Sequence, residues 1–362
     1  MTKRLLFLNG LAILTIPLHH AAAYGFQAMF FWGDLYRGIP PGPNFDLMGS
    51  MTYYILVIIR QLDTYSVPGF LFISGYFVAF MARGKEANVT FKTLAPRIKV
   101  LIFPFFIWTV VRYALLRQWP ESVEDVVNPY HFIPLLIQFY LLSPWLVPFA
   151  RKNWKLFLLI AAAFHLGVQG LRYIDDLGMT FPGLDLLLRL TPRWIVIGQQ
   201  PFWFPFGLVF GLHTKQFSAW FTKHKWKWIA LTVVFGMLAV AEYHFADYLN
   251  GEAWIGPTPE GFFRNFYILF FLLTFLTFDV PPNTGTKTIA AIGSQSLGIY
   301  LANIPTIYVV SVLMVRIVPA VLGIQLIYQI VLILCGLLIP MSMMWIVRSI
   351  PTLRPAYRYI FG

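Results

Sequence analysis

Ten apolar stretches recur along the 362-residue chain, and each is long enough to cross the hydrocarbon core of a membrane as a helix. Because lipid offers no hydrogen-bond partners to the backbone, such a series predicts a bundle of transmembrane α-helices. The predicted spans are residues 5–24, 65–82, 98–116, 130–149, 156–171, 194–213, 227–243, 263–279, 289–312 and 325–347. A further apolar segment, residues 45–62, is predicted to be an interfacial or re-entrant helix.

The composition supports a membrane location. Hydrophobic residues make up 58% of the chain and charged residues only 12%, which is about half the charged share of a soluble domain. So few charges could not cover a surface that faces water. No internal repeat and no Gly/Ser linker divides the chain. We therefore predict an all-α polytopic integral membrane protein, with residues 1–362 forming a single domain.

The charged residues predict the orientation of this bundle. With the N-terminus inside, the cytoplasmic segments hold all 11 lysines, whereas the nine basic residues of the outer segments are all arginine. Only Glu86 and Asp279 are acidic on the inner side. An excess of Lys and Arg in cytoplasmic loops is the usual topological signal, so both termini are predicted to be cytoplasmic. The net charge of +12 has the same explanation, and nucleic-acid binding is not expected.

Several classes of site are excluded or not supported. A single cysteine, Cys335, allows no intrachain disulfide and no Cys-based metal site. No P-loop, GxGxxG or HExxH motif occurs, so nucleotide hydrolysis and zinc proteolysis have no support, and no metal is expected. The start of the chain, Lys3-Arg4 and an apolar run, is interpreted as a retained first helix rather than a cleaved signal peptide.

Two adjacent histidines, His19 and His20, lie near the outer end of the first span, RLLFLNGLAILTIPLHH. Ionisable residues in a span are costly and suggest a functional site. At 100° per residue His20 lies on the same side of the helix as Asn9, and Pro17 removes a backbone hydrogen bond nearby. A neutral imidazole there can take a proton from a hydroxyl group. The alternative is an interfacial histidine that reaches toward lipid headgroups.

Two later segments also carry polar residues in apolar surroundings. The segment VPGFLFISGYF, residues 67–77, contains Ser74 and Gly75, and close helix packing explains such small residues better than a nucleophilic serine. The segment APRIKVLIFPFFIW, residues 95–108, opens with Arg97 and Lys99 at a cytoplasmic mouth. Both side chains can hold a phosphate or pyrophosphate, although topological signalling alone also explains basic residues there.

Together these segments make the chain resemble the acyltransferase 3 family. The SGYF block is similar to the second-span motif of the family, and the basic block before Pro104 is similar to its entry to the third span. HFIPLLIQFYLLSPWL, residues 131–146, resembles the fourth-span segment, with Tyr140 and Pro144 in register. GSQSLGIYLANIP, residues 293–305, resembles a late serine-x-x-isoleucine-tyrosine-leucine segment. The order of the motifs and the ten-span count both agree with the family.

The resemblance implies transfer of an acyl group, usually acetyl from acetyl-CoA, to a hydroxyl of a cell-surface or exported carbohydrate. It implies His20 as the general base, with His19 as the second candidate. It also implies a site for acyl-CoA, to which we assign Arg97 and Lys99 together with two residues of the SGYF block. Those two are Ser74 and Tyr76.

The expected surroundings follow from the same resemblance. They are the bacterial cytoplasmic (inner) membrane and its lipids, with partners in polysaccharide assembly. Outer-loop residues Arg172, Asp175 and Asp176 are candidates for contact with the sugar. The chain departs from the family pattern at Asn9, because the family motif is an arginine, ten further residues and then the histidine, and Asn9 stands in the arginine position before His20. Asn9 is nevertheless kept as a candidate catalytic residue because it matches that position.

Two other functions fit the same features. Buried polar residues and interrupted helices also suit a transporter or flippase for a glycan or a lipid-linked saccharide, although no repeat symmetry supports this. The departures from the family pattern also fit an inactive relative that acts as a scaffold in polysaccharide assembly.

Overall fold

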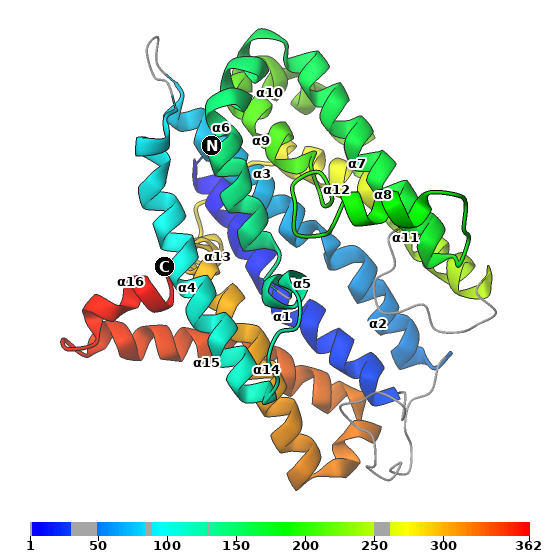
Figure 1. Cartoon of the computed structure of the whole chain (residues 1–362), viewed down its shortest axis with the longest axis vertical. Coiled ribbons are helices and arrows are strands. Elements are labelled where there is room, and N and C mark those ends of the chain that lie inside the picture. The colour runs from blue at the N-terminus through cyan, green and yellow to red at the C-terminus, as the bar shows by residue number, and fades with distance from the viewer. Residues whose placement is uncertain (1, 30–48, 84–88, 129, 250–260) are drawn as a thin grey trace. The chain divides into compact units, whose positions relative to one another are not determined.

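The computed structural model describes residues 2–29, 49–83, 89–128, 130–249 and 261–362, and these residues form helices and turns without a strand (Figure 1). Among the residues assigned above, 45–48, Lys85 and Glu86 lie outside these ranges. In chain order the helices are α1 Thr2–Met29, α2 Met51–Leu62, α3 Ser66–Met81, α4 Phe91–Leu116, α5 Val123–Val127, α6 Phe132–Lys152, α7 Trp154–Asp176, α8 Leu184–Leu190, α9 Trp203–Leu212, α10 Thr214–Lys223, α11 Lys225–Leu249, α12 Phe262–Thr277, α13 Thr284–Gly293, α14 Ser296–Ile317, α15 Gln325–Ser349 and α16 Tyr357–Ile360.

The prediction of an all-α polytopic membrane protein is confirmed. In the part of the chain that the structure describes, eight helical segments are long and apolar enough to cross a membrane, and α9 and α12 are shorter apolar helices. Each of the ten predicted spans overlaps one of these segments or helices. A helix suits such apolar runs, because it pairs its backbone groups internally, apart from those at its ends, while apolar side chains face lipid.

The structure differs from the predicted boundaries at three places. Residues 45–62 were set apart from the next span, but α2 continues through the short 3-10 turn η1, Asp63–Tyr65, directly into α3, giving one apolar segment of 31 residues. The predicted span 194–213 is helical only from Trp203, because turns precede it. The predicted span 289–312 is interrupted between α13 and α14. These boundaries depend on tertiary contacts, which hydropathy does not report.

The described residues form two compact units. The second unit consists of Leu6–Ser66, Phe103–Gln118 and Asn283–Gly362. In it α14 packs against α15 (Figure 1). Its buried core brings together apolar side chains from α1, α14, α15 and the 3-10 turn η2, Pro319–Gly323, including Ala21, Ile307 and Leu332. α1 continues through Pro17 without an interruption of the helix.

The first unit consists of Met1–Leu5, Val67–Ile102 and Trp119–Pro282. Here α11 packs against α12, and α6 and α7 both pack against α9. The backbones of α3 and α9 approach so closely that a Cβ on Gly75 would lie 2.1 Å from the carbonyl oxygen of Phe204. A Cβ on Gly207 would lie 1.9 Å from that of Phe72. The prediction that the small residues of the SGYF block serve helix packing is therefore confirmed for Gly75.

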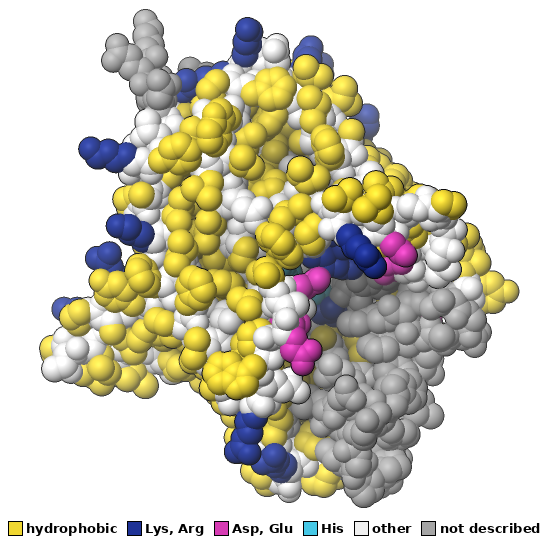
Figure 2. Space-filling model, viewed as in Figure 1, with side chains coloured by type: hydrophobic (Ala, Val, Ile, Leu, Met, Phe, Trp, Pro, Cys, Tyr) yellow, Lys and Arg dark blue, Asp and Glu magenta, His cyan; other side chains and the backbone are white. Residues whose placement is uncertain are grey.

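Much of the surface is apolar, as lipid contact requires. Figure 2 shows hydrophobic side chains over most of the face drawn, with acidic side chains gathered in a small area. Exposed large apolar residues occur along several spans, among them Val110, Leu159 and Trp345. In water such a surface would be an aggregation site, whereas in a bilayer it is the lipid-facing surface.

The predicted orientation has a direct test at Trp220, which is 49% exposed on α10. In a Cys335→Ser background, a Trp220→Cys variant should resist an impermeant maleimide in intact cells and react after permeabilisation, because α10 is predicted to be cytoplasmic. Trp119→Cys is the matched control, since Trp119 is 86% exposed in a predicted outer segment and should react from outside. Labelling of position 220 in intact cells would reverse the orientation.

Candidate active site

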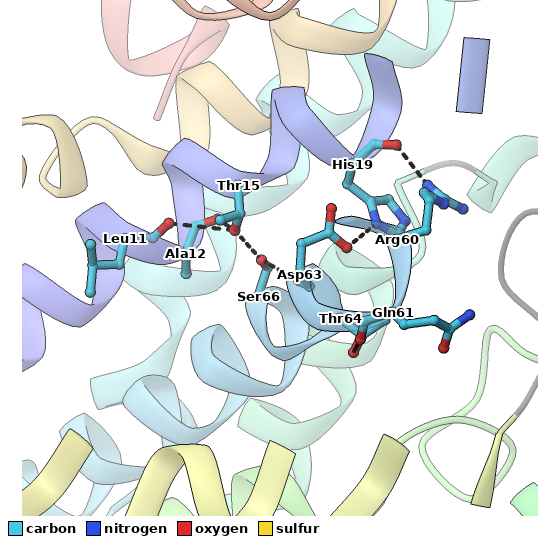
Figure 3. A network of polar contacts seen from close by, with 9 residues as sticks. All are labelled: Leu11, Ala12, Thr15, His19, Arg60, Gln61, Asp63, Thr64 and Ser66. Atoms are coloured by element: carbon cyan, nitrogen blue, oxygen red, sulfur yellow. Dashed lines mark hydrogen bonds and ion pairs between the residues drawn. The ribbon is translucent and has the colours of Figure 1, made fainter. Parts of the chain in front are cut away.

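A network of polar contacts joins α1 to the turn between α2 and α3, all within the second unit (Figure 3). Thr15 and His19 are four residues apart on α1, so both lie on one face of the helix. Asp63 begins the 3-10 turn and Ser66 follows it. The tight turn therefore presents a carboxylate and a hydroxyl to the polar face of α1.

His19 and Asp63 form the central contact of this network. Nδ1 of His19 lies 2.6 Å from Oδ1 of Asp63, and the two side chains are 24% and 3% exposed. The guanidinium of Arg60, a buried residue, donates a hydrogen bond of 2.8 Å to the backbone carbonyl of His19. The positive charge of Arg60 also acts on Asp63. His19 is thus held both at Nδ1 of its ring and at its backbone carbonyl.

Two hydroxyl groups, those of Thr15 and Ser66, link α1 to the backbone of Asp63. The hydroxyl oxygens of Thr15 and Ser66 are 2.5 Å apart. Ser66 also donates a hydrogen bond of 2.9 Å to the backbone carbonyl of Asp63. The second carboxylate oxygen of Asp63, Oδ2, has no hydrogen-bond partner among the described residues. A buried carboxylate in an apolar segment is costly, so its presence here points to function rather than to stability.

His20 lies beside this network. Its ring is 5.6 Å from that of His19, at an angle of 81°, and the residue is half-buried. One residue further along α1 corresponds to a rotation of about 100°, so the two imidazoles point in different directions. The structure therefore brings both histidine candidates together, and it places the carboxylate against His19.

Asn9 lies at another part of the same helix. Its side-chain amide donates to the carbonyl of Gly293 at 2.6 Å and to the hydroxyl of Ser296 at 3.0 Å, at the junction of α13 and α14. Eleven residues separate it from His20, which is about 16 Å along a helix axis. The structure therefore does not bring Asn9 to the imidazoles, and its contacts hold α1 against the α13–α14 junction.

In the first unit the residues predicted to bind acyl-CoA fall into two groups. The hydroxyl of Tyr140, a buried residue of α6, hydrogen-bonds with both Ser74 and Arg97. Tyr76 instead accepts a hydrogen bond of 3.2 Å from Arg83, whose guanidinium also donates to the carbonyl of Gly211 at 2.9 Å.

Two of the residues predicted to bind acyl-CoA are exposed. They are Arg97 and Lys99, both near the start of α4. Since the guanidinium of Arg97 carries five N–H donors, its contact with one hydroxyl leaves donors for an anionic ligand. The structure thus groups Arg97 with Ser74, places Tyr76 with Arg83, and leaves Lys99 at the surface.

Three residues with functional geometry were missed from the sequence as site residues. Asp63 fell between two predicted helical segments and was counted with the outer loops, while Arg60 was counted only as a basic residue of the outer side. Tyr140 was noted only as part of the family motif. An ionisable pair inside an apolar run is itself a signal, and the sequence IIRQLD, residues 58–63, contains one.

The outer-loop candidates have different positions. Arg172 is buried and donates hydrogen bonds to the carbonyls of Thr191 and Gly198, at 2.6 and 2.8 Å. It therefore shapes the chain that follows α8. Asp175 is exposed and Asp176 is half-buried at the end of α7. Within the described ranges, no group of three or more His, Cys, Asp or Glu side chains is placed to hold a metal ion.

Comparison with known proteins agrees with the motif order. A family model described as an acyltransferase domain, that of the acyltransferase 3 family, matches residues 5–345. Comparisons with curated proteins and with solved structures give no match. The family match covers nearly the whole chain and both units. The chain is therefore a membrane acyltransferase-type protein that belongs to the acyltransferase 3 family.

Proposed function

We propose that the protein is a membrane O-acyltransferase that moves an acyl group, in the simplest case acetyl, from acyl-CoA to a hydroxyl of a cell-surface or exported carbohydrate. The observation that carries this proposal is the imidazole–carboxylate pair of His19 and Asp63, 2.6 Å apart in an apolar segment. Such a pair has the composition of a general base and the group that orients it. The bacterial cytoplasmic membrane suits this reaction, because acyl-CoA is available on one side and the glycan on the other.

The proposed reaction is direct transfer. With Asp63 ionised, Nδ1–H of His19 donates to Oδ1, and Nε2 keeps the lone pair that accepts a proton. Nε2 takes the proton of the acceptor hydroxyl as its oxygen attacks the thioester carbonyl. The C–S bond then breaks, and the thiolate of CoA takes up the proton from the imidazolium. The products are an O-acyl ester and free CoA.

The geometry shifts the proposed base from His20 toward His19. From the sequence alone His20 matched the family position, and that assignment stays a prediction. His19 has the buried carboxylate partner, and Arg60 holds its backbone carbonyl. A fixed tautomer and a fixed ring orientation are what a general base requires. We therefore propose His19 as the base and Asp63 as its positioning residue, with His20 as the alternative.

We propose that acyl-CoA binds from the cytoplasmic side and that its phosphates contact Arg97 and Lys99. Ser74 and Tyr140 would act as the polar wall beside Arg97, because the Tyr140 hydroxyl hydrogen-bonds with both. This arrangement uses one N–H group of the guanidinium and leaves the others for phosphate oxygens. Tyr76 contributes indirectly, through the contact that orients Arg83.

The donor site has a quantitative test. The double change Arg97→Ala, Lys99→Ala should raise the apparent KM for acyl-CoA at least about tenfold, since each charge-assisted phosphate contact contributes about 1–2 kcal/mol. Protein yield should stay near normal, because both side chains are exposed. Lys92→Ala, an exposed lysine of the same helix, is the control and should leave KM unchanged. Unchanged affinity in the double variant would return Arg97 and Lys99 to a purely topological role.

A further inference from the structure

A polar cavity of about 300 Å³ lies in the first unit, next to α5. Its polar and aromatic lining consists of Glu124, Asn128, His131, Arg193, Trp194 and Gln199. We call this cavity the α5 pocket. One wall comes from the connection between α4 and α6, and the other from the connection between α7 and α9. Because α6 and α7 both cross the membrane, these two connections lie on the same side, which is the predicted outer side.

The wall formed by residues 191–199 is held from behind by two polar side chains. The side-chain amide of Gln138 on α6 donates a hydrogen bond of 2.6 Å to the carbonyl of Trp194. Its oxygen accepts a hydrogen bond of 3.2 Å from the backbone N–H of Val196. Arg172 on α7 holds the carbonyls of Thr191 and Gly198. Two membrane helices thus fix the backbone on either side of the lining residues. A rigid wall of this kind lowers the entropic cost of binding.

Gly198 shows how tightly this wall is folded. A Cβ at this position would lie 2.0 Å from the carbonyl oxygen of Pro192, so only glycine allows the approach. Gln200, two residues further, adopts a left-handed backbone with φ of 54°. A left-handed conformation is unfavourable for a residue with a side chain and persists where the surroundings enforce it. The wall is therefore a built surface rather than plain connecting chain.

Gln199 carries the second observation that points to a ligand. The residue is only 9% exposed and lines the pocket, and its Oε1 has no hydrogen-bond partner among the described residues. A buried acceptor without a partner is costly and marks a position that a ligand donor can occupy. Gln199 therefore contributes an unsatisfied amide oxygen to the lining of the pocket.

The rest of the lining matches a sugar better than the other molecules of the proposed reaction. Trp194, which is half-buried, offers a flat apolar surface on which the C–H face of a sugar ring can lie. Glu124 and Arg193 bring one negative and one positive charge, so the lining does not favour a polyanion such as CoA. Both are exposed at the rim, where they can accept from and donate to hydroxyl groups.

We propose that the α5 pocket is a binding subsite for an uncharged sugar unit of the acceptor, on the outer side of the membrane. This inference rests on the proposed transfer to carbohydrate and adds the place and the chemical class of the acceptor. The volume is at the lower end for ligand pockets, so the subsite takes one or two sugar rings. Trp194 stacks on the ring, Gln199 accepts from a hydroxyl at the bottom, and Glu124 binds a second hydroxyl at the rim.

Saturation-transfer NMR on the full-length protein in nanodiscs tests the subsite. The probes are the methyl glycosides of glucose, galactose, mannose and N-acetylglucosamine, with methyl glucuronide as the anionic comparison. At least one neutral glycoside should receive saturation at millimolar concentration, and methyl glucuronide should receive less. Gln199→Leu should weaken this binding about tenfold, the effect of a lost buried hydrogen bond. Glu124→Ala, an exposed change on α5 that leaves folding intact, should weaken it several-fold.

The controls separate this inference from the proposed function. Gln216→Leu, an exposed glutamine of α10, should leave glycoside binding unchanged. Acetyl-CoA binding, measured on the same samples, should be the same in the Gln199 and Glu124 variants as in the wild type. Absence of saturation in every neutral glycoside, or binding that survives both substitutions, overturns the subsite even if acetyl-CoA binds. Glycoside binding without acetyl-CoA binding would instead overturn the proposed function and keep the subsite.

Discussion

Acyl transfer by the His19→Ala protein is expected to be at least about 10²-fold slower than by the wild type, because this change removes the proposed general base. The residue is half-buried and its ring contacts a side chain at the turn before α3, so the helix itself should persist. The measurement is the initial rate of transfer from labelled acetyl-CoA by purified protein, with folding verified by the elution profile in detergent. His224 lies between α10 and α11. His224→Ala is the matched histidine control and should keep the wild-type rate.

Asp63→Asn tests whether Asp63 positions His19, because the histidine itself is kept in this variant. An asparagine keeps the size of the side chain but replaces the acceptor-only carboxylate by an uncharged amide. Its NH2 group can donate to Nδ1 of His19, so the Nδ1–H tautomer is no longer fixed. We expect a loss in kcat of about 10² to 10⁴-fold with little change in the KM for acyl-CoA. Asp63→Glu should restore part of kcat. A structural role alone would instead lower yield and thermal stability in both variants.

The same assay decides between the two histidines. His20→Ala should cost less than His19→Ala, because the buried carboxylate of Asp63 contacts the ring of His19 (Figure 3). A His20→Ala protein that loses 10²-fold or more, beside a His19→Ala protein of normal rate, would reverse the assignment and support the position predicted from the sequence.

The second large effect concerns stability. Gly207→Ala should destabilise the protein by at least about 3 kcal/mol, the upper range for overpacking, because the added Cβ meets the backbone of α3 rather than a movable side chain. The distance to the carbonyl oxygen of Phe72 would be 1.9 Å, so α3 and α9 must separate. Gly75→Ala should behave similarly, since its Cβ would meet the carbonyl of Phe204 at 2.1 Å.

The control for this series is Gly170→Ala on α7, where a Cβ would meet nothing within 4 Å. Alanine favours a helix over glycine by about 1 kcal/mol, so this variant should be as stable as the wild type or more stable. The measurement is the thermal midpoint of unfolding or aggregation in detergent. Equal midpoints for Gly207→Ala and Gly170→Ala would contradict the close approach of α3 and α9.

The helices could be predicted from the sequence because the signal for a span is local. An uninterrupted apolar run reports its own environment, and all ten predicted spans overlap an apolar helix of the structure. Their boundaries were less predictable. The chain before Trp203 was included in a predicted span, but Gly198 allows it to fold into turns that Arg172 and Gln138 hold in place. Those contacts join residues far apart in the sequence.

The site was only partly predictable for the same reason. The two histidines stand out in an apolar helix, and the structure does bring them together. The partner of His19 lies 44 residues away, in a turn that joins α2 to α3. Hydropathy separated these helices, so Asp63 was counted as a loop acid. Asn9 was assigned from its match to a family position, but its contacts show it holding the α13–α14 junction.

The most direct test of the central claim is acyl transfer by the purified protein in nanodiscs, with labelled acetyl-CoA as donor and the glycans of its native membrane as acceptor. The label should appear as a base-labile ester on carbohydrate, and free CoA should be released in equal amount. His19→Ala and Asp63→Asn should each slow both at least about 10²-fold. Label that never reaches carbohydrate, or the same rate of ester formation in both variants, would contradict the central claim.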